Sequence, residues 1–228
     1  MATVRDFHPG DVLRPWIAAC WTNDATGTIA RVLPDGCADI IFDLDRDDAF
    51  VVGTMTRPLV VEADAHGRLF GIRFRPGRLS NLFRMPLSEV TDARVPLREI
   101  DPTLDLHPES IAADLQRRLT EGDRRVDAAV ALLSRTAGRC DIDRVAEAAC
   151  VTRQHLGRLF ARHVGVSPKT FARIVRFRHA LRLGRNRPCA DVAALLGYSD
   201  QSHLIAEFRE FSGTTPVPFF LSTANGDS

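Results

Sequence analysis

An internal repeat in the last third of the chain constrains its fold more than any other feature. When segments 145–171 and 192–219 are aligned, the shared residues fall at apolar and turn positions, and the polar residues differ. One residue is inserted in the turn of the second segment. The matched pairs are Val145/Val192, Ala146/Ala193, His155/His203, Leu156/Leu204, Phe160/Phe208, Gly165/Gly213, Pro168/Pro216 and Phe171/Phe219. This pattern indicates two copies of one structural unit with different surfaces.

The first copy has the signals of a short helix, a tight turn and a second helix. Asp141 is placed to cap the short helix, and Thr152 is placed to cap the second one. Apolar residues recur at helical spacing through both segments. Gly165 follows the last of them, as expected for the residue after a helix C-terminus.

The second copy predicts the same arrangement over residues 188–213. Gly197 marks the turn, Ser199 is the expected cap of the second helix and Gly213 its stop. Cys150 takes the turn position that glycine fills in the second copy. A left-handed turn residue with a side chain is strained, so we expect a small cost at Cys150. Between the copies, Ser167 and Pro168 begin a long helix that would hold both units at a fixed separation.

Two stretches carry a family resemblance. They read HLGRLFARHVGVSPKTF at 155–171 and GYSDQSHLIAEFREFSGTTP at 197–216. With them, residues 126–222 resemble the DNA-binding domain of AraC/XylS transcription regulators, which has two helix-turn-helix units joined by a linker helix. The resemblance implies that double-stranded DNA is the partner and that both recognition helices enter successive major grooves, about 34 Å apart. It leaves open whether the chain is an activator, which would also contact RNA polymerase, or a repressor.

The start of each recognition helix would read the DNA. Arg158 falls in the family's arginine position, where it can bind a guanine edge or a phosphate, whereas Ala206 fills that position in the second unit. Glu207 and Glu210 are expected further along, where the helix leaves the groove. Candidate base readers are Thr152, Arg153, Gln154, Arg158, Ser199, Gln201, Ser202 and Ile205. Candidate phosphate contacts on the linker helix are Arg173, Arg176 and Arg182.

The charge distribution agrees with a DNA-binding end. Residues 136–218 hold 13 Lys or Arg and 7 Asp or Glu, a net charge of +6. Residues 1–135 hold 17 arginines and 21 acidic residues, a net charge of −4. The basic C-terminal region therefore suggests binding to nucleic acid, and the acidic N-terminal region suggests a different function.

Residues 1–105 predict a β-rich part, barrel-like in outline, because short apolar runs alternate with Pro, Gly and Asp. The pieces LPDGCADIIFDL, VVGTMTRP and GIRFRPG resemble the sensor-type domain that precedes some regulators of this family, which suggests a small-molecule effector or an assembly role. Residues 106–125 form a helical connector in this division. Its apolar stripe of Ile111, Leu115 and Leu119 fits either a homodimer helix or a packed connector.

We therefore expect an α+β multidomain protein that regulates transcription in the cytoplasm, with no membrane partner. No apolar run reaches the length of a membrane span, and the N-terminus lacks a signal-peptide pattern. Five scattered cysteines predict no metal site, and no motif predicts a cofactor or catalytic residues. Two alternatives stay open. One is an enzyme or alkyl-acceptor domain, with Cys37 as the acceptor, fused to a DNA-binding module, and the other is a non-specific DNA-architectural protein.

Overall fold

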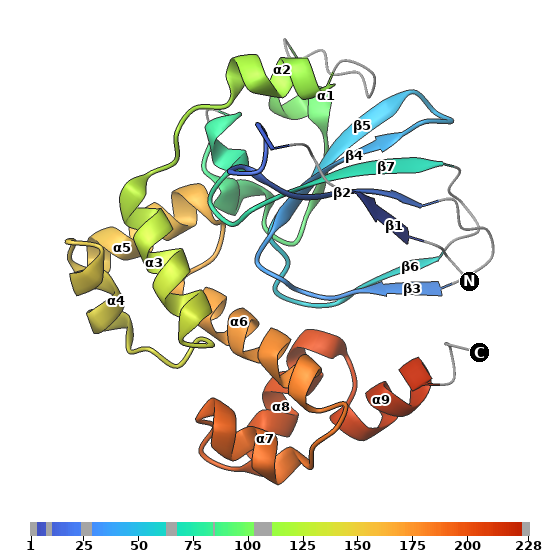
Figure 1. The fold of residues 1–228 in the computed structure, drawn as a ribbon. Coiled ribbons are helices and arrows are strands. Elements are labelled where there is room, and N and C mark those ends of the chain that lie inside the picture. The colour runs from blue at the N-terminus through green and yellow to red at the C-terminus, as the bar shows by residue number, and fades with distance from the viewer. Residues whose placement is uncertain are drawn as a thin grey trace.

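The computed structural model has a β-rich part, formed by the N-terminal strands, and a helical part that carries the C-terminal third (Figure 1). It describes residues 4–7, 11–23, 29–62, 68–83, 85–102 and 111–224. The order of the elements confirms the α+β class expected from the sequence, with strands first and a helical helix-turn-helix region last.

The main sheet is antiparallel and open. Its strands lie in the order β1-β2-β7-β4-β5-β8, and β3 and β6 pair separately. The edge strands β1 and β8 do not pair with each other in the part of the chain that the structure describes, so the barrel-like outline expected from the sequence is wrong. The bounds are β1 Val4–Phe7, β2 Ile17–Asn23, β3 Ile29–Val32, β4 Ala38–Asp43, β5 Asp48–Val52, β6 Leu59–Glu62, β7 Leu69–Phe74 and β8 Arg94–Pro96.

The core of the β-rich part also takes up the connector. Ile40, Val51 and Ile72 from the central strands are fully buried. Short helices cover the sheet, namely η2 (Leu79–Asn81), η3 (Leu87–Val90), α1 (Leu97–Ile100) and α2 (Ile111–Arg118). The apolar stripe of Ile111, Leu115 and Leu119 belongs to the same buried cluster as the strands. The stripe is therefore a packed connector, and its side chains are not available as a dimer face.

The helical part contains the two repeat units and their neighbours. Helix α3 packs on α4, α5 and α6, and a separate cluster of aromatic residues joins α6 to α8. In the described residues no helix is both long and apolar enough to cross a membrane. The bounds are α3 Arg124–Arg135, α4 Ile142–Ala148, α5 Arg153–His163, α6 Pro168–Leu183, α7 Cys189–Leu196, α8 Gln201–Ser212 and α9 Pro216–Ala224.

The two parts contact each other at the C-terminal ends of both recognition helices. The two parts also pack closely at Gly36 of the β-rich part and Phe171 of α6. A Cβ added to Gly36 would lie only 2.6 Å from the Phe171 ring. Leu33 packs against the aromatic cluster between α6 and α8. The polar contacts are Thr54 Oγ1 to Val164 O (2.6 Å), Thr91 Oγ1 to Gly165 O (2.6 Å), Arg31 Nη1 to Ser212 O (3.0 Å), Ser80 Oγ with His163 Nδ1 (2.9 Å) and Arg78 with Asp127 (2.9 Å).

Candidate nucleic-acid interface

The first helix-turn-helix unit consists of α4 and α5. Asp141 caps α4 by accepting from the Asp143 amide at 2.7 Å, and Thr152 caps α5 by accepting from the His155 amide at 3.2 Å. Both caps are those predicted from the sequence. The turn residue Cys150 has φ +53°, in the left-handed region. The strained turn expected at this position is therefore present.

The second unit consists of α7 and α8, and its turn residue Gly197 has φ +69°. The expected cap is wrong by one residue. Asp200, not Ser199, caps α8, because its carboxylate accepts from the His203 amide at 2.8 Å. Ser199 instead shares a hydrogen bond with His203 Nδ1 at 3.1 Å. A carboxylate is a stronger acceptor than a hydroxyl, and the backbone hydrogen bond from His203 lowers the pKa of Asp200.

The side chains that the sequence assigns to DNA on α5 lie on its exposed face. Arg153 pairs with Asp143 at 3.2 Å, but both side chains are more than half exposed, so DNA can compete for this arginine. Gln154 and Arg158 are exposed, and in the described residues neither side chain has a hydrogen-bond or ion-pair partner. Leu156 and Phe160, on the opposite face, are fully buried.

The first turns of α8 expose no charged side chain, whereas Arg209 and Glu210 are exposed further along the helix. Gln201, Ser202 and Ala206 are exposed, and Ile205 is half-buried against the cluster formed by α7 and the start of α8. A short apolar side chain in that position can contact a thymine methyl only at its exposed edge. The base-reading roles of these residues stay predictions, as do those on α5.

A family model described as a helix-turn-helix domain matches residues 145–220. Residues 145–220 form an AraC-type DNA-binding domain. A second model, described as a domain of unknown function (DUF6597), matches residues 5–96. A search of curated proteins found no match.

A search of solved structures found regulators that are similar to parts of this chain. A regulator with an AraC-type DNA-binding domain from Chromobacterium violaceum is 22% identical, covering 44% of this chain and 93% of its own, with a TM-score of 0.42. The DNA-binding domain of AdpA in complex with a target DNA is 20% identical, covering 45% and 94%, with a TM-score of 0.41. ToxT from Vibrio cholerae, with unsaturated fatty acid bound, is 10% identical, covering 89% and 93%, with a TM-score of 0.48.

A buried carboxylate organises the second unit of the AraC-type domain. Glu207 is only 3% exposed, a burial that was not expected from its position further along α8. Glu207 lies on α8, and its carboxylate joins this helix to α6 and to the turn that precedes α8. We call Arg173, Arg176, Tyr198, Glu207 and Glu210 the Glu207 cluster. Its bonds are Arg173 Nε to Glu207 (2.8 Å), Arg176 Nε and Nη2 to Glu207 (3.2 and 3.1 Å), Tyr198 Oη to Glu207 (2.8 Å) and Arg173 Nη2 to Glu210 (2.5 Å).

The electrostatics of the Glu207 cluster favour a charged carboxylate. Burial alone would raise the pKa of Glu207, but hydrogen bonds from Arg176, Arg173 and Tyr198 lower it below its usual value. Burial and the neighbouring Glu207 carboxylate raise the pKa of Tyr198, so its hydroxyl remains a donor. The Arg176 guanidinium also lies 4.4 Å from the centre of the Tyr198 ring.

The burial of Glu207 could have been predicted from the spacing of its apolar neighbours on α8, but an acidic residue is not expected on a buried face. Leu204, Glu207, Phe208 and Phe211 follow the i, i+3, i+4, i+7 spacing of a helix face that packs inward. All four are buried. An acid on such a face needs a buried cation, and the arginines of α6 supply it.

Two of the three candidate phosphate contacts are thus already engaged within the AraC-type domain. Arg173 and Arg176 bond Glu207, although their side chains keep 27% and 16% exposure. Arg182 lies on a different face of α6. Arg182 follows Arg173 by nine residues. Because each residue of an α-helix rotates by about 100° around the axis, the two side chains lie about 180° apart. None of these positions settles whether an arginine contacts phosphate, so the phosphate-contact roles stay predictions.

A basic groove of about 610 Å³ lies between the two units. It reaches from the start of α5 to the start of α8, and its walls combine side chains of both units with the first turns of α6. Sequence reasoning did not find Arg139 or Lys169 as members of this surface. The charged residues that line it are Arg139, Asp141, Arg153, Lys169, Arg173, Arg176 and Glu207. In the described residues, no group of acidic, histidine and cysteine side chains could hold a metal ion.

Proposed function

We propose that this chain is a DNA-binding transcription regulator that acts sequence-specifically in the cytoplasm, with α5 and α8 each entering a major groove. The helix-turn-helix domain matched at residues 145–220 supports DNA binding. The observation that supports this most directly is the pair of capped recognition helices, whose exposed side chains differ while their buried faces repeat. Because the exposed side chains of α5 and α8 differ, we expect the DNA site to be asymmetric, with a different sequence in each major groove.

We also propose that α5 dominates the affinity. Its exposed Arg158 can form a bidentate contact with guanine, whereas α8 offers the shorter, neutral side chains of Gln201 and Ser202. The basic groove between the units is the proposed place for the intervening DNA backbone, with Arg139 and Lys169 as phosphate contacts.

The proposed control comes from the β-rich part, through a small-molecule effector or through assembly. In the β-rich part, the hydroxyls of Thr54 and Thr91 and the guanidinium of Arg31 donate hydrogen bonds to carbonyl oxygens at the ends of α5 and α8. A change in the β-rich part would therefore alter the relative placement of the two readers, which DNA binding requires to match one helical turn.

The alkyl-acceptor alternative is disfavoured by the surroundings of Cys37. Burial, and then the neighbouring Asp35 carboxylate, raise the pKa of this thiol well above its ordinary value. The thiolate is the reactive form, so the protonated thiol of Cys37 is a poor nucleophile.

The test compares Arg158→Ala with Arg162→Ala, an exposed arginine one turn further along α5. A binding site is first selected from random duplexes, and the affinities of all single-base variants are then measured at fixed salt. R158A should relax specificity at one base pair by about 1–3 kcal/mol. R162A should leave the profile unchanged, and Q201A or S202A should cost less affinity than R158A.

A uniform loss across all sequences for R158A would support a non-specific architectural protein and contradict the proposal. A larger loss for Q201A than for R158A would show that α8 is the dominant reader.

A further inference from the structure

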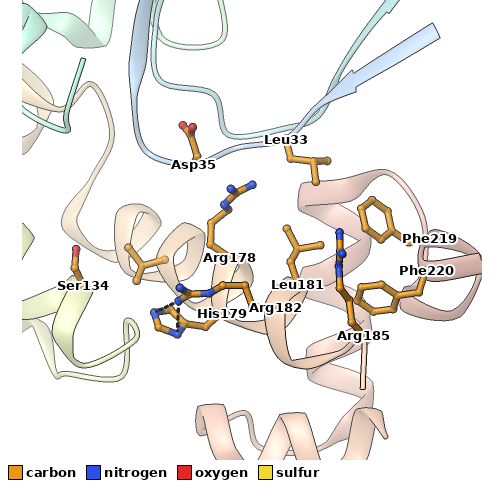
Figure 2. A pocket seen from close by; sticks show the side chains of 11 residues that line it. Leu33, Asp35, Ser134, Arg178, His179, Leu181, Arg182, Arg185, Phe219 and Phe220 are labelled. Carbon is orange, nitrogen blue, oxygen red and sulfur yellow. Dashed lines mark hydrogen bonds between the residues drawn. The ribbon is translucent and has the colours of Figure 1, made fainter. Parts of the chain in front are cut away.

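A cavity of about 690 Å³ opens between the β-rich part and the helical part. Figure 2 shows it bounded above by the loop that carries Leu33 and Asp35, and below by the C-terminal half of α6. Phe219 and Phe220 of α9 close one side, and Ser134 of α3 lies at the other. We call it the arginine cavity, because Arg178, Arg182 and Arg185 line it.

The positive charge of the arginine cavity is not matched by the protein around it. Arg182 bonds His179, a neutral partner whose pKa burial and then Arg182 itself lower. Arg178 and Arg185 make no hydrogen bond or ion pair in the described part of the chain. Among the described residues of the lining, the one carboxylate is that of Asp35, which already pairs with Arg73 at 3.4 Å. The three arginine side chains are exposed at the mouth of the cavity, and three guanidinium groups on one surface favour the binding of a small anion there.

Apart from Ser134, the rest of the described lining is apolar. Leu33, Leu181, Phe219 and Phe220 form one wall, and Figure 2 shows Arg185 rising beside the two rings. The arginine cavity also faces away from the basic groove, which lies across α6. A DNA phosphate in the groove would not reach it. An occupant must therefore combine an acidic group with an apolar body, and be small enough for the space between the two parts.

We propose that the arginine cavity binds a small organic anion, with its acidic group held by Arg178 and Arg185 and its apolar body packed on Leu33, Leu181 and Phe220. The site joins the loop before β4 to the linker helix α6, so an occupant ties the β-rich part to the element that spaces the two readers. The binding stands alone, whereas its regulatory consequence rests on the proposed DNA-binding function.

The experiment uses the full chain and two dyes that differ in one group. 8-Anilinonaphthalene-1-sulfonate (ANS) carries an aromatic body and a sulfonate, and N-phenyl-1-naphthylamine is the same body without the charge. Fluorescence titrations are made with the wild type, with Arg178→Gln/Arg185→Gln, and with Arg187→Gln as the matched control, an exposed arginine outside the cavity lining. Circular dichroism checks that each variant is folded.

The double variant should weaken ANS binding by about tenfold or more and leave the neutral dye unchanged, because each arginine supplies a charge-assisted hydrogen bond. R187Q should bind both dyes as the wild type does. Ser134→Trp, which fills the cavity from an exposed rim position, should weaken both dyes. S134W keeps the test decisive if the double variant does not fold.

Three results would overturn the proposal: equal ANS affinity in the wild type and the double variant, equal loss in R187Q, or unchanged dye binding in S134W. Displacement of ANS by non-specific duplex DNA would reassign these arginines to phosphate contact. Failure of the proposed function would appear separately, as a lack of sequence preference in the DNA measurements with the dye titrations unaffected.

Discussion

Replacing Glu207 with glutamine tests how far one buried carboxylate holds the second reader in place. The substitution keeps the volume and removes the charge. The glutamine oxygen can still accept from the arginines, but its NH₂ group faces only donors where an oxygen accepted before. The change therefore loses about half of the hydrogen bonds at Glu207 and leaves two guanidinium groups short of a counter-charge.

The magnitude follows from the exposure of each partner. Removing one member of a fully buried ion pair costs about 3–5 kcal/mol. Arg173 and Arg176 keep 27% and 16% exposure and Arg173 retains Glu210, so water and the second acid offset part of the loss. We expect E207Q to lower the free energy of unfolding by about 2–3 kcal/mol, or roughly 4–12 °C in melting temperature for a chain of this size.

Urea unfolding followed by circular dichroism at 222 nm measures this loss in the full chain. Glu210→Gln is the matched control, since its carboxylate is half exposed and bonds the same Arg173. E210Q should cost less than about 1 kcal/mol. Equal costs for the two variants would refute the reasoning, because they would show that burial of the Glu207 carboxylate contributes nothing to the stability of the fold.

Further predictions concern pH, the turns and the contact between the two parts. The stability that the Glu207 carboxylate contributes is complete above its unfolded-state pKa of about 4.5 and is lost as the pH falls through its lower folded-state pKa. In urea titrations, the difference in free energy of unfolding between the wild type and E207Q should therefore narrow only below about pH 4.5. Cys150→Gly should raise the free energy of unfolding by roughly 0.5–1 kcal/mol, and Gly197→Ala should lower it by about 1 kcal/mol or more, because both positions are left-handed. The opposite signs would contradict the strain assigned to this turn. Thr54→Val leaves the Val164 carbonyl without its donor and should cost about 1–3 kcal/mol by the same assay, and a neutral result would show that this contact is replaced by water.

The local features of the helical part were predictable from the sequence because each depends on a few neighbouring residues. Caps at Asp141, Thr152 and Ser167 and the left-handed turn at Cys150 follow from residue type and spacing alone. The cap of α8 was misplaced, because Ser199 and Asp200 are adjacent and both are good caps. Only the backbone path of the turn decides between them.

Features that depend on distant residues were not predictable. The strand runs were visible, but the order β1-β2-β7-β4-β5-β8 joins segments far apart in the chain, and the strand pattern does not encode whether a sheet closes. Glu207 needs Arg173 and Arg176, which lie more than thirty residues away. The arginine cavity likewise forms only when the loop at Leu33 meets α6.

The bonds from the β-rich part to the recognition helices bear on how such a protein can change its target. Thr54, Thr91 and Arg31 all donate to main-chain oxygens at helix ends, and these bonds involve none of the side chains that we propose as base readers. Carbonyl oxygens are present whatever the side chain. If α5 and α8 read DNA as proposed, substitutions along their outer faces would change the preferred DNA sequence and leave these bonds to the β-rich part intact.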